Sequence, residues 1–174
     1  LTFAVVLRSI LCLDPDILLV GEIRDGETAE IAAQSALTGH LVFSTLHTND
    51  SATAVTRLVD MGVDPYLVAS TVIGVFAQRL VRRLCPDCRS QDEENNWHAP
   101  GCRHCDYGGF RGRLGIYELL LINDDLRKLV MDGRSASEIM QHAREKGMLS
   151  LLDDGMAKVD QGLTTRDEVL RVGH

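Results

Sequence analysis

The chain has 174 residues, of which 45% are hydrophobic and 25% are charged, and its formal net charge is −7. These proportions are typical of a soluble globular protein with one ordinary domain or two small ones. A nucleic-acid partner is not expected, because the chain is acidic and only 5% of its residues are aromatic. A transmembrane segment is not expected either, since the longest apolar stretch, residues 66–84, contains Gln78 and three arginines.

The first residues read as the interior of a longer sequence. The segment LTFAVVLRSILCLDPD has no basic region followed by a small-residue cleavage site, so no signal peptide is expected. It also lacks an initiator methionine and begins inside an apolar pattern. Apolar residues at helical spacing over residues 2–12 predict a helix, which Asp14-Pro15 ends. We therefore expect the chain to be part of a longer protein.

The following residues predict strands that alternate with helices. The apolar run at residues 16–20 is interpreted as a short, fully buried strand, and residues 41–46 alternate into another buried strand. Helices are expected over residues 28–37, 51–61 and 65–84, the first two of which stop at glycines. This alternation indicates an α/β fold with a parallel sheet, whose function lies at the carboxyl ends of the strands. Two strands are too few for a complete sheet of this kind, which again indicates that an N-terminal part is missing.

The composition changes at Cys85. Residues 85–112 are rich in Cys, Gly, Asp, Asn and His and show little periodicity. A strand-like run follows over residues 113–122, and the remainder is predicted to be helical, with Ser135 and Thr165 as helix N-caps. The expected domains are therefore residues 1–84, 85–112 and 113–174.

Two predicted strands lead into residues that can carry chemistry. The run ILLVG is followed by Glu22, and the run LVFSTL is followed by His47. Each has a simpler interpretation, because Glu22 could form a surface ion pair with Arg24 and a lone histidine is more often just hydrogen-bonded in place. Parallel neighbours in one sheet would bring Glu22 and His47 to the same edge. A carboxylate beside an imidazole there can orient water and contact a phosphate oxygen.

A resemblance to a known family rests on long motifs. The segment DPDILLVGEIRDGETAEIAAQSALTGHLVFSTLHTND resembles the Walker B and histidine-box region of the secretion and pilus ATPase superfamily. The continuation GVDPYLVASTVIGVFAQRLVRRLCPDC and the later FRGRLGIYELL are similar to the type II secretion assembly ATPases (GspE family), with the type IV pilus extension ATPases as the alternative. The resemblance covers essentially the whole chain. It implies the C-terminal half of a RecA-like P-loop NTPase domain, a small tetracysteine zinc-binding insertion and a C-terminal helical subdomain.

The resemblance also implies roles for particular residues. Glu22 would be the Walker B catalytic glutamate, which polarises the attacking water and helps to organise Mg²⁺ through water. Gly21 stands where many other ATPases have a metal-directed aspartate. His40 and His47 would be the histidine-box residues, with His47 expected at the γ-phosphate of ATP. Arg24 would either bridge subunits or pair with the adjacent aspartate.

At the level of the whole protein, the resemblance implies a homo-oligomeric, hexameric ATPase that uses ATP and Mg²⁺. It would be cytoplasmic and peripheral on the inner membrane, which it would reach through inner-membrane secretion platform proteins. No G-x-x-x-x-G-K-[ST] motif occurs in the chain, and all three lysines lie in the predicted helical tail. Because the phosphate-binding loop is expected upstream, we expect the chain alone to bind ATP weakly or not at all and not to turn it over. A non-catalytic, zinc-stabilised interaction module is the alternative for the isolated chain.

Four of the five cysteines form two C-x-x-C pairs, Cys85 with Cys88 and Cys102 with Cys105. Disulfides are a poor explanation without a secretion signal, and a redox motif would require a thioredoxin-like βαβ pattern. Four thiolates at this spacing predict a closed tetrahedral site that holds a structural Zn²⁺. The resemblance agrees, because many family members carry such a module.

Other residues near the cysteine pairs have weaker interpretations. His98 and His104 are less favoured as ligands, because the cysteine set is already complete. Cys12 stands apart and is interpreted as a small, buried hydrophobic residue. Nearby arginines either form a docking surface or are solvated and internally paired. These arginines are Arg82, Arg83, Arg89, Arg103, Arg111 and Arg113.

Overall fold

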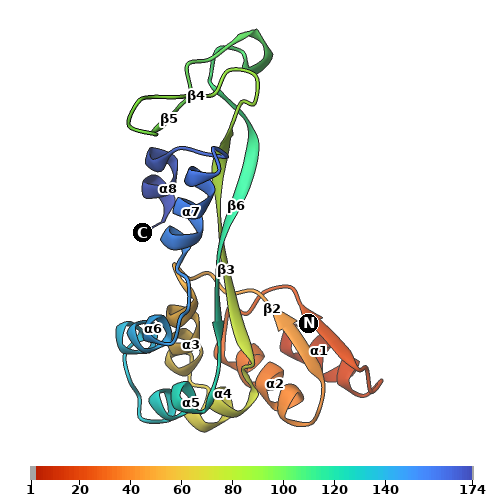
Figure 1. Cartoon of the computed structure of the whole chain (residues 1–174). Helices are drawn as coiled ribbons and strands as arrows, with labels where there is room; N and C mark the ends of the chain where they lie inside the picture. The colour runs from red at the N-terminus through yellow and green to blue at the C-terminus, as the bar shows by residue number, and fades with distance from the viewer. Residues whose placement is uncertain (1–2, 174) are drawn as a thin grey trace. The chain divides into compact units, whose positions relative to one another are not determined.

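The computed structural model describes residues 3–173. The chain forms two compact units, and each takes its residues from two separate stretches of the sequence. The first contains the residues up to Val75 together with Leu120–Lys146, and the second contains Phe76–Leu119 together with the residues from Gly147 onward. Figure 1 shows both units, with most of their helices and strands labelled. The expected domain boundaries after residues 84 and 112 stay a prediction.

A parallel pair of strands lies in the first unit. β1 (Ile17–Val20) pairs with β2 (Leu41–Ser44), with Ile17 opposite Leu41 and Val20 opposite Ser44. α1 (Phe3–Leu11) packs against α2 (Gly26–Leu37), which also packs against β2. The predicted parallel pairing is confirmed, and it places the carboxyl ends of both strands at one edge.

Both strands are less buried than the sequence predicted. On β1, Leu18 and Val20 are buried, whereas Ile17 is 61% exposed and Leu19 is 80% exposed. No residue of β2 is buried, and Phe43 is 53% exposed. The prediction of two fully buried strands is therefore wrong for this chain. A parallel strand is buried on both faces only where helices cover both, and the described residues leave one face of this sheet open.

Two helices of this unit stop at glycines, as predicted, and begin at aspartate N-caps that the sequence analysis did not identify. Asp25 caps α2 and Asp50 caps α3 (Ser51–Asp60), each by accepting a hydrogen bond from a backbone N–H of the first turn. Gly39 and Gly62 follow these helices with φ of 109° and 97°, a backbone region that suits glycine because it has no Cβ.

Two later helices complete the first unit. α5 (Asp124–Met131) packs against α4 (Pro65–Thr71) and against α6 (Ala136–Glu145), which also packs against α3. Ser135 caps α6 in a reciprocal arrangement with Glu138, which confirms the predicted N-cap. No helix within residues 3–173 has the length and apolar character needed to cross a membrane.

The predicted helix from Pro65 to Leu84 is wrong beyond its second turn. α4 spans Pro65–Thr71, and the chain then extends into β3 (Gly74–Leu84). Burial along the first part of β3 alternates, since every second residue is sheltered (Val75, Ala77, Arg79 and Val81) and the residues between them are exposed. This period of two is the signature of a strand, and it outweighs the apolar content that suggested a continuous helix.

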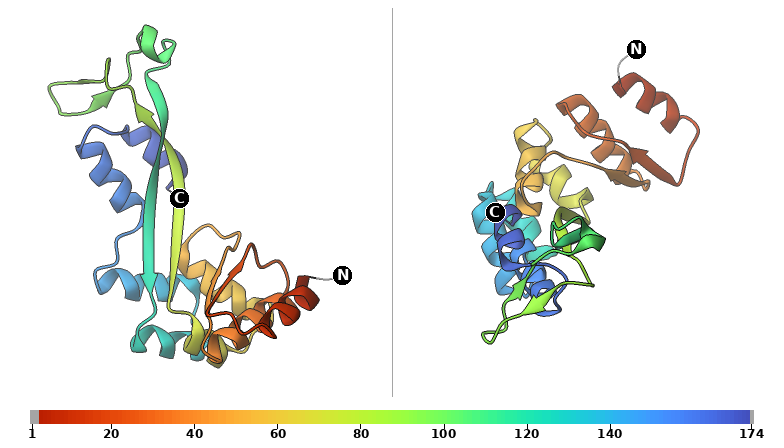
Figure 2. Two further views of the ribbon diagram at one scale, coloured as in Figure 1. Left: turned by 90° about the vertical axis from the view of Figure 1, so that its right-hand side faces the viewer. Right: turned by 90° about the horizontal axis from the view of Figure 1, so that it is seen from above.

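β3 pairs with β6 (Phe110–Leu121), and the two strands run side by side in opposite directions (Figure 2). The ladder is flanked by hydrogen bonds from Cys85 N to Gly109 O and from Ile122 N to Ile73 O. Between them β3 has 11 residues and β6 has 12, so β6 carries one extra residue. Gly112, with φ of 76°, is the residue suited to such a β-bulge. The strand predicted at residues 113–122 is confirmed, with an earlier start.

Two helices pack with this ladder in the second unit. α7 (Leu151–Asp160) and α8 (Arg166–Val172) contact each other at Gly155, where a Cβ would clash with the Val169 side chain. The core brings together Val81, Ile116 and Leu151. Thr165 caps α8, as predicted.

Short elements lie between β3 and β6 in the chain, in the segment that carries the cysteine pairs. β4 (Ser90–Gln91) and β5 (Trp97–His98) form an antiparallel hairpin, and a 3₁₀ turn, η1, spans Arg103–Cys105. This irregular segment holds no large core, which matches the lack of periodicity in its sequence.

Candidate functional site

Glu22 and His47 meet at the carboxyl edge of the parallel sheet. Glu22 follows β1 and His47 follows β2, and the register of the two strands brings them together. His47 Nε2 lies 3.3 Å from Glu22 Oε2. The predicted adjacency of these residues is confirmed, and this edge is where open α/β sheets bind their ligands.

Arg24 completes this group on the other carboxylate oxygen. Its Nη2 lies 2.6 Å from Glu22 Oε1, so Arg24 pairs with Glu22 and not with Asp25, which caps α2. The Arg24 guanidinium, assisted by His47, lowers the pKa of Glu22 below its ordinary value. Glu22 is therefore ionised at neutral pH and able to accept a hydrogen bond from water. Its side chain is 34% exposed, which leaves it accessible.

Gly21 has a neighbour that sequence reasoning missed. Its carbonyl accepts a hydrogen bond of 2.7 Å from Thr45 Oγ1, and Ile23 N donates to Thr45 O at 3.0 Å. Thr45 thus touches the backbone on both sides of Glu22. Thr45 lies beside Gly21 because it follows Ser44, the partner of Val20 in the paired strands. The sequence alone does not give this register, so it could not identify Thr45.

His40 lies away from this group. It precedes β2 at the amino end of the sheet, and the four residues of that strand span about 13 Å. Its Nδ1 lies 3.0 Å from Ser35 O, and its buried Nε2 has Asp14 Oδ1 at 4.0 Å. The structure therefore separates His40 from His47, and the role expected for His40 stays a prediction.

The four paired cysteines form one cluster. Their sulfurs all lie within 4.8 Å of one another, and the shortest separations are 3.8 and 3.9 Å. A metal at the centre of a tetrahedron with M–S bonds of about 2.3 Å places its sulfurs about 3.8 Å apart. The distances are too long for disulfides, whose sulfurs lie about 2.05 Å apart. The cluster is therefore compatible with a structural metal held by Cys85, Cys88, Cys102 and Cys105.

The surroundings of the cluster shift the pKa values of two of its thiols in opposite directions. Cys105 Sγ accepts hydrogen bonds from the backbone N–H groups of Cys102 and Gly109, which lower its pKa to about 7. Burial among the other sulfurs raises the pKa of Cys88 to about 12. A cation at the centre would favour the thiolate form of all four, as metal-bound sulfur requires.

The nearby histidines have other partners. His98 Nε2 lies 2.8 Å from Asp92 Oδ2, and His104 Nδ1 lies 3.0 Å from Asp87 Oδ2. Both side chains thus pair with carboxylates, in agreement with a site made of cysteines. Cys12 is exposed, so the prediction that it is buried is wrong.

Two of the nearby arginines make internal contacts. Arg82 Nη2 pairs with Glu168 at 2.7 Å, and Arg89 Nη1 donates to Gly162 O at 2.5 Å. Internal pairing therefore accounts for Arg82 and Arg89, while a docking role for the remaining arginines stays a prediction.

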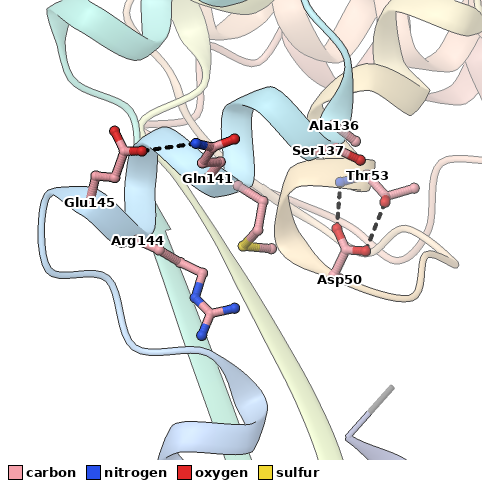
Figure 3. Close-up of a pocket in the computed structure, with 8 residues that line it drawn as sticks. Asp50, Thr53, Ala136, Ser137, Gln141, Arg144 and Glu145 are labelled. Carbon is pink, nitrogen blue, oxygen red and sulfur yellow. Dashed lines mark hydrogen bonds between the residues drawn. The ribbon is translucent and has the colours of Figure 1, made fainter.

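A shallow groove of about 510 Å³ lies between the start of α3 and α6 (Figure 3). Asp50 accepts hydrogen bonds from Thr53, and Gln141 donates to Glu145 across one turn of α6. These polar groups already bond within their own segments. None of the predicted site residues lines this groove.

The chain is similar to characterised secretion proteins over nearly its whole length. It is 56% identical over 172 residues to the type II secretion system protein HxcR of Pseudomonas aeruginosa, which covers 99% of the chain and 36% of that protein. It is 48% identical to the type II secretion system ATPase E of Vibrio cholerae, covering 99% of the chain and 37% of that protein. The type IV pilus assembly ATPase PilB of Thermus thermophilus is also 48% identical, with 98% of the chain and 21% of that protein covered. The chain thus spans about a third or less of these relatives.

Solved structures share the fold. The crystal structure of the pilus retraction motor PilT with bound ADP matches with a TM-score of 0.73 and 30% identity, over 98% of the chain and 43% of PilT. The Legionella pneumophila ATPase DotB has a TM-score of 0.71 over 98% of the chain and 42% of DotB, and at 24% identity it supports the fold alone. These matches confirm the predicted α/β class. The family model described as type II/IV secretion system protein matches residues 1–171, and the chain therefore belongs to that family.

Proposed function

We propose that the chain is the C-terminal part of an ATPase that couples ATP hydrolysis to type II protein secretion by driving pseudopilus assembly. The observation that carries the proposal is the Glu22–Arg24–His47 group at the carboxyl edge of a parallel sheet. Residues 1–84 belong to the ATPase domain, residues 85–112 form the metal module, and residues 113–174 form the helical subdomain.

In this proposal Glu22 orients and polarises the water that attacks the γ-phosphate. Its ionised carboxylate is the acceptor, and Arg24 and His47 limit its movement by contacting one oxygen each. The exposed imidazole of His47 contacts the γ-phosphate, while His40, the other histidine-box residue, hydrogen-bonds to Ser35 of α2. Mg²⁺, when bound with ATP, would supply charge neutralisation at the phosphates, and Glu22 would help to hold it through water.

The similarity to HxcR and to the Vibrio cholerae ATPase favours type II secretion over the type IV pilus. The pilus alternative rests on the Thermus thermophilus relative. We further propose a homo-oligomer, a hexamer, that is cytoplasmic and reaches the inner membrane through secretion platform proteins, without nucleic acid. The metal of the cysteine cluster is Zn²⁺, which prefers four thiolates in a closed tetrahedral site.

The proposal is tested by steady-state ATP hydrolysis with the full-length protein. Glu22→Gln keeps the size of the side chain and removes its charge, and it should lower turnover by about 100-fold or more, as loss of a group that handles the attacking water does. Glu30→Gln is a matched control, because Glu30 lies on α2 and contacts Gln34 only through an exposed hydrogen bond. Unchanged turnover in Glu22→Gln would contradict the proposal. The 174-residue chain alone should show no turnover.

A further inference from the structure

Thr45 holds the backbone on both sides of Glu22. The register of β1 and β2 places Thr45 beside Gly21, one step beyond the pair Val20 and Ser44. Thr45 Oγ1 donates to Gly21 O at 2.7 Å, and Thr45 O accepts from Ile23 N at 3.0 Å. One residue at the end of β2 therefore fixes the segment that presents the carboxylate.

The backbone before Glu22 needs such a contact because Gly21 is conformationally free. Glycine has more accessible backbone conformations than other residues, and a Cβ at Gly21 would meet nothing within 4 Å. No packed side chain at that position can therefore hold the peptide that precedes Glu22. On the other side Ile23 is only 7% exposed, so burial anchors it. The Thr45 hydroxyl supplies the missing restraint on the Gly21 side.

We propose that Thr45 is a positioning residue for Glu22, acting through the hydrogen bond from its hydroxyl to Gly21 O. This proposal rests on the proposed function of Glu22 in ATP hydrolysis. Thr45 itself contacts neither the carboxylate nor the water. It sets the direction in which Glu22 leaves the strand, so that the carboxylate meets Arg24 and His47 and faces the position of the attacking water.

The alternative is that Thr45 only continues the pairing of β2 with β1. The two contacts separate these roles, because the bond from Ile23 N goes to the backbone carbonyl of Thr45, which a side-chain substitution leaves in place. Thr45→Val has nearly the same shape and removes only the hydroxyl. Thr45→Ser keeps the hydroxyl and removes only the methyl group. A comparison of these two variants therefore isolates the bond to Gly21.

The experiment measures kcat and KM for ATP with the full-length protein. Thr45→Val should lower kcat by about three- to tenfold, the range expected for one hydrogen bond, and leave KM within about twofold. Thr45→Ser should stay within about twofold of the wild type in both constants. Thr71→Val is a matched control, because it removes a hydroxyl that bonds to Leu67 O within α4. Thr45→Ala, which also lacks the hydroxyl, replaces Thr45→Val if thermal unfolding shows that the latter is misfolded.

Combination with Glu22→Gln separates positioning from general damage. If Thr45 acts through Glu22, Thr45→Val should cause no further loss in the residual turnover of Glu22→Gln, measured with radiolabelled ATP over hours. An equal loss in both backgrounds, a Thr45→Ser variant as slow as Thr45→Val, or wild-type kcat in Thr45→Val would overturn the role of Thr45. Unchanged turnover in Glu22→Gln would instead contradict the proposed function itself, so the two failures are distinguishable.

Discussion

Glu22 and Glu168 differ in exposure, which distinguishes a carboxylate that a ligand can reach from one that only holds two elements together. Glu22 and Glu168 each pair with arginine, but the Glu22 side chain is 34% exposed and that of Glu168 only 4%. Glu168 accepts hydrogen bonds from Arg82 N, Arg82 Nη2 and Arg171 and fixes α8 to β3. Glu22 also has a partner on each oxygen, but its exposure keeps access for a water or a ligand.

The Glu168 contacts predict a pH-dependent contribution to stability. The guanidinium of Arg82 lowers the pKa of Glu168 from 4.5 to about 2. A lowered folded-state pKa stabilises the fold above the unfolded value, and this contribution is lost as the pH falls from about 4.5 towards 2. Glu168→Gln should therefore lower the free energy of unfolding by on the order of 2 kcal/mol at pH 7.

Urea denaturation between pH 3 and pH 7 measures this effect. The difference between wild type and Glu168→Gln should shrink as the pH falls, while the exposed control Glu30→Gln should stay within about 0.5 kcal/mol throughout. A difference that does not change with pH would show that the Glu168 carboxylate is not the source of the stabilisation.

At the scale of elements, periodicity predicted most of the secondary structure, and one error has a clear cause. The run from Gly74 to Leu84 is apolar and arginine-rich, which suits a helix by composition, but its sheltered residues recur every second position. Helix ends were predictable because caps and glycines act locally, as at Ser135 and Gly39. The exposure of β1 and β2 was not predictable, because it depends on which layers cover the sheet.

Gly162 joins the β4–β5 hairpin to the turn between α7 and α8. Arg89 donates to its carbonyl and lies over the ring of Trp97, with the guanidinium 5.2 Å from the ring centroid. A Cβ on Gly162 would come within 2.6 Å of that ring, so an alanine there must displace Trp97. We expect Gly162→Ala to lower the free energy of unfolding by about 1–3 kcal/mol more than Gly133→Ala.

Gly133 is a matched control for this substitution. Both glycines have φ of 67°, and a Cβ on Gly133 would meet nothing within 4 Å, so the two variants share the backbone strain but not the clash. Trp97 is the only tryptophan of the chain, so its fluorescence reports the displacement directly. Equal stabilities and unshifted emission in both variants would disprove the contact.

The cysteine module predicts a metal-dependent fold. The hairpin that carries Trp97 lies between the two cysteine pairs, and the module has little apolar surface to hold it. We expect one Zn²⁺ per chain by elemental analysis, and a shift of Trp97 emission to longer wavelength after chelation. Cys102→Ser should reproduce the loss of zinc, whereas Cys12→Ser should not. A zinc-free chain with unchanged emission would contradict this prediction.

At the scale of the whole molecule, the chain supplies one side of the proposed ATP site. Sequence reasoning identified Glu22 and His47 because each follows a strand, and parallel topology was enough to place them together. It did not identify Thr45, whose role depends on the register of the strands, and it grouped His40 with His47 although β2 separates them. The sequence thus predicted that Glu22 and His47 lie together, while the distances among the predicted residues required the structure.

The proposed function makes its most direct prediction for nucleotide bound to the full-length protein. If Glu22 acts on the attacking water and not on ATP binding, Glu22→Gln should bind ATP and fail to cleave it. The measurement is the nucleotide content of gel-filtered protein after incubation with ATP and Mg²⁺. We expect mainly ADP in the wild type and mainly uncleaved ATP in Glu22→Gln. ADP in both proteins at the same proportion would contradict the assignment of Glu22 as the catalytic carboxylate.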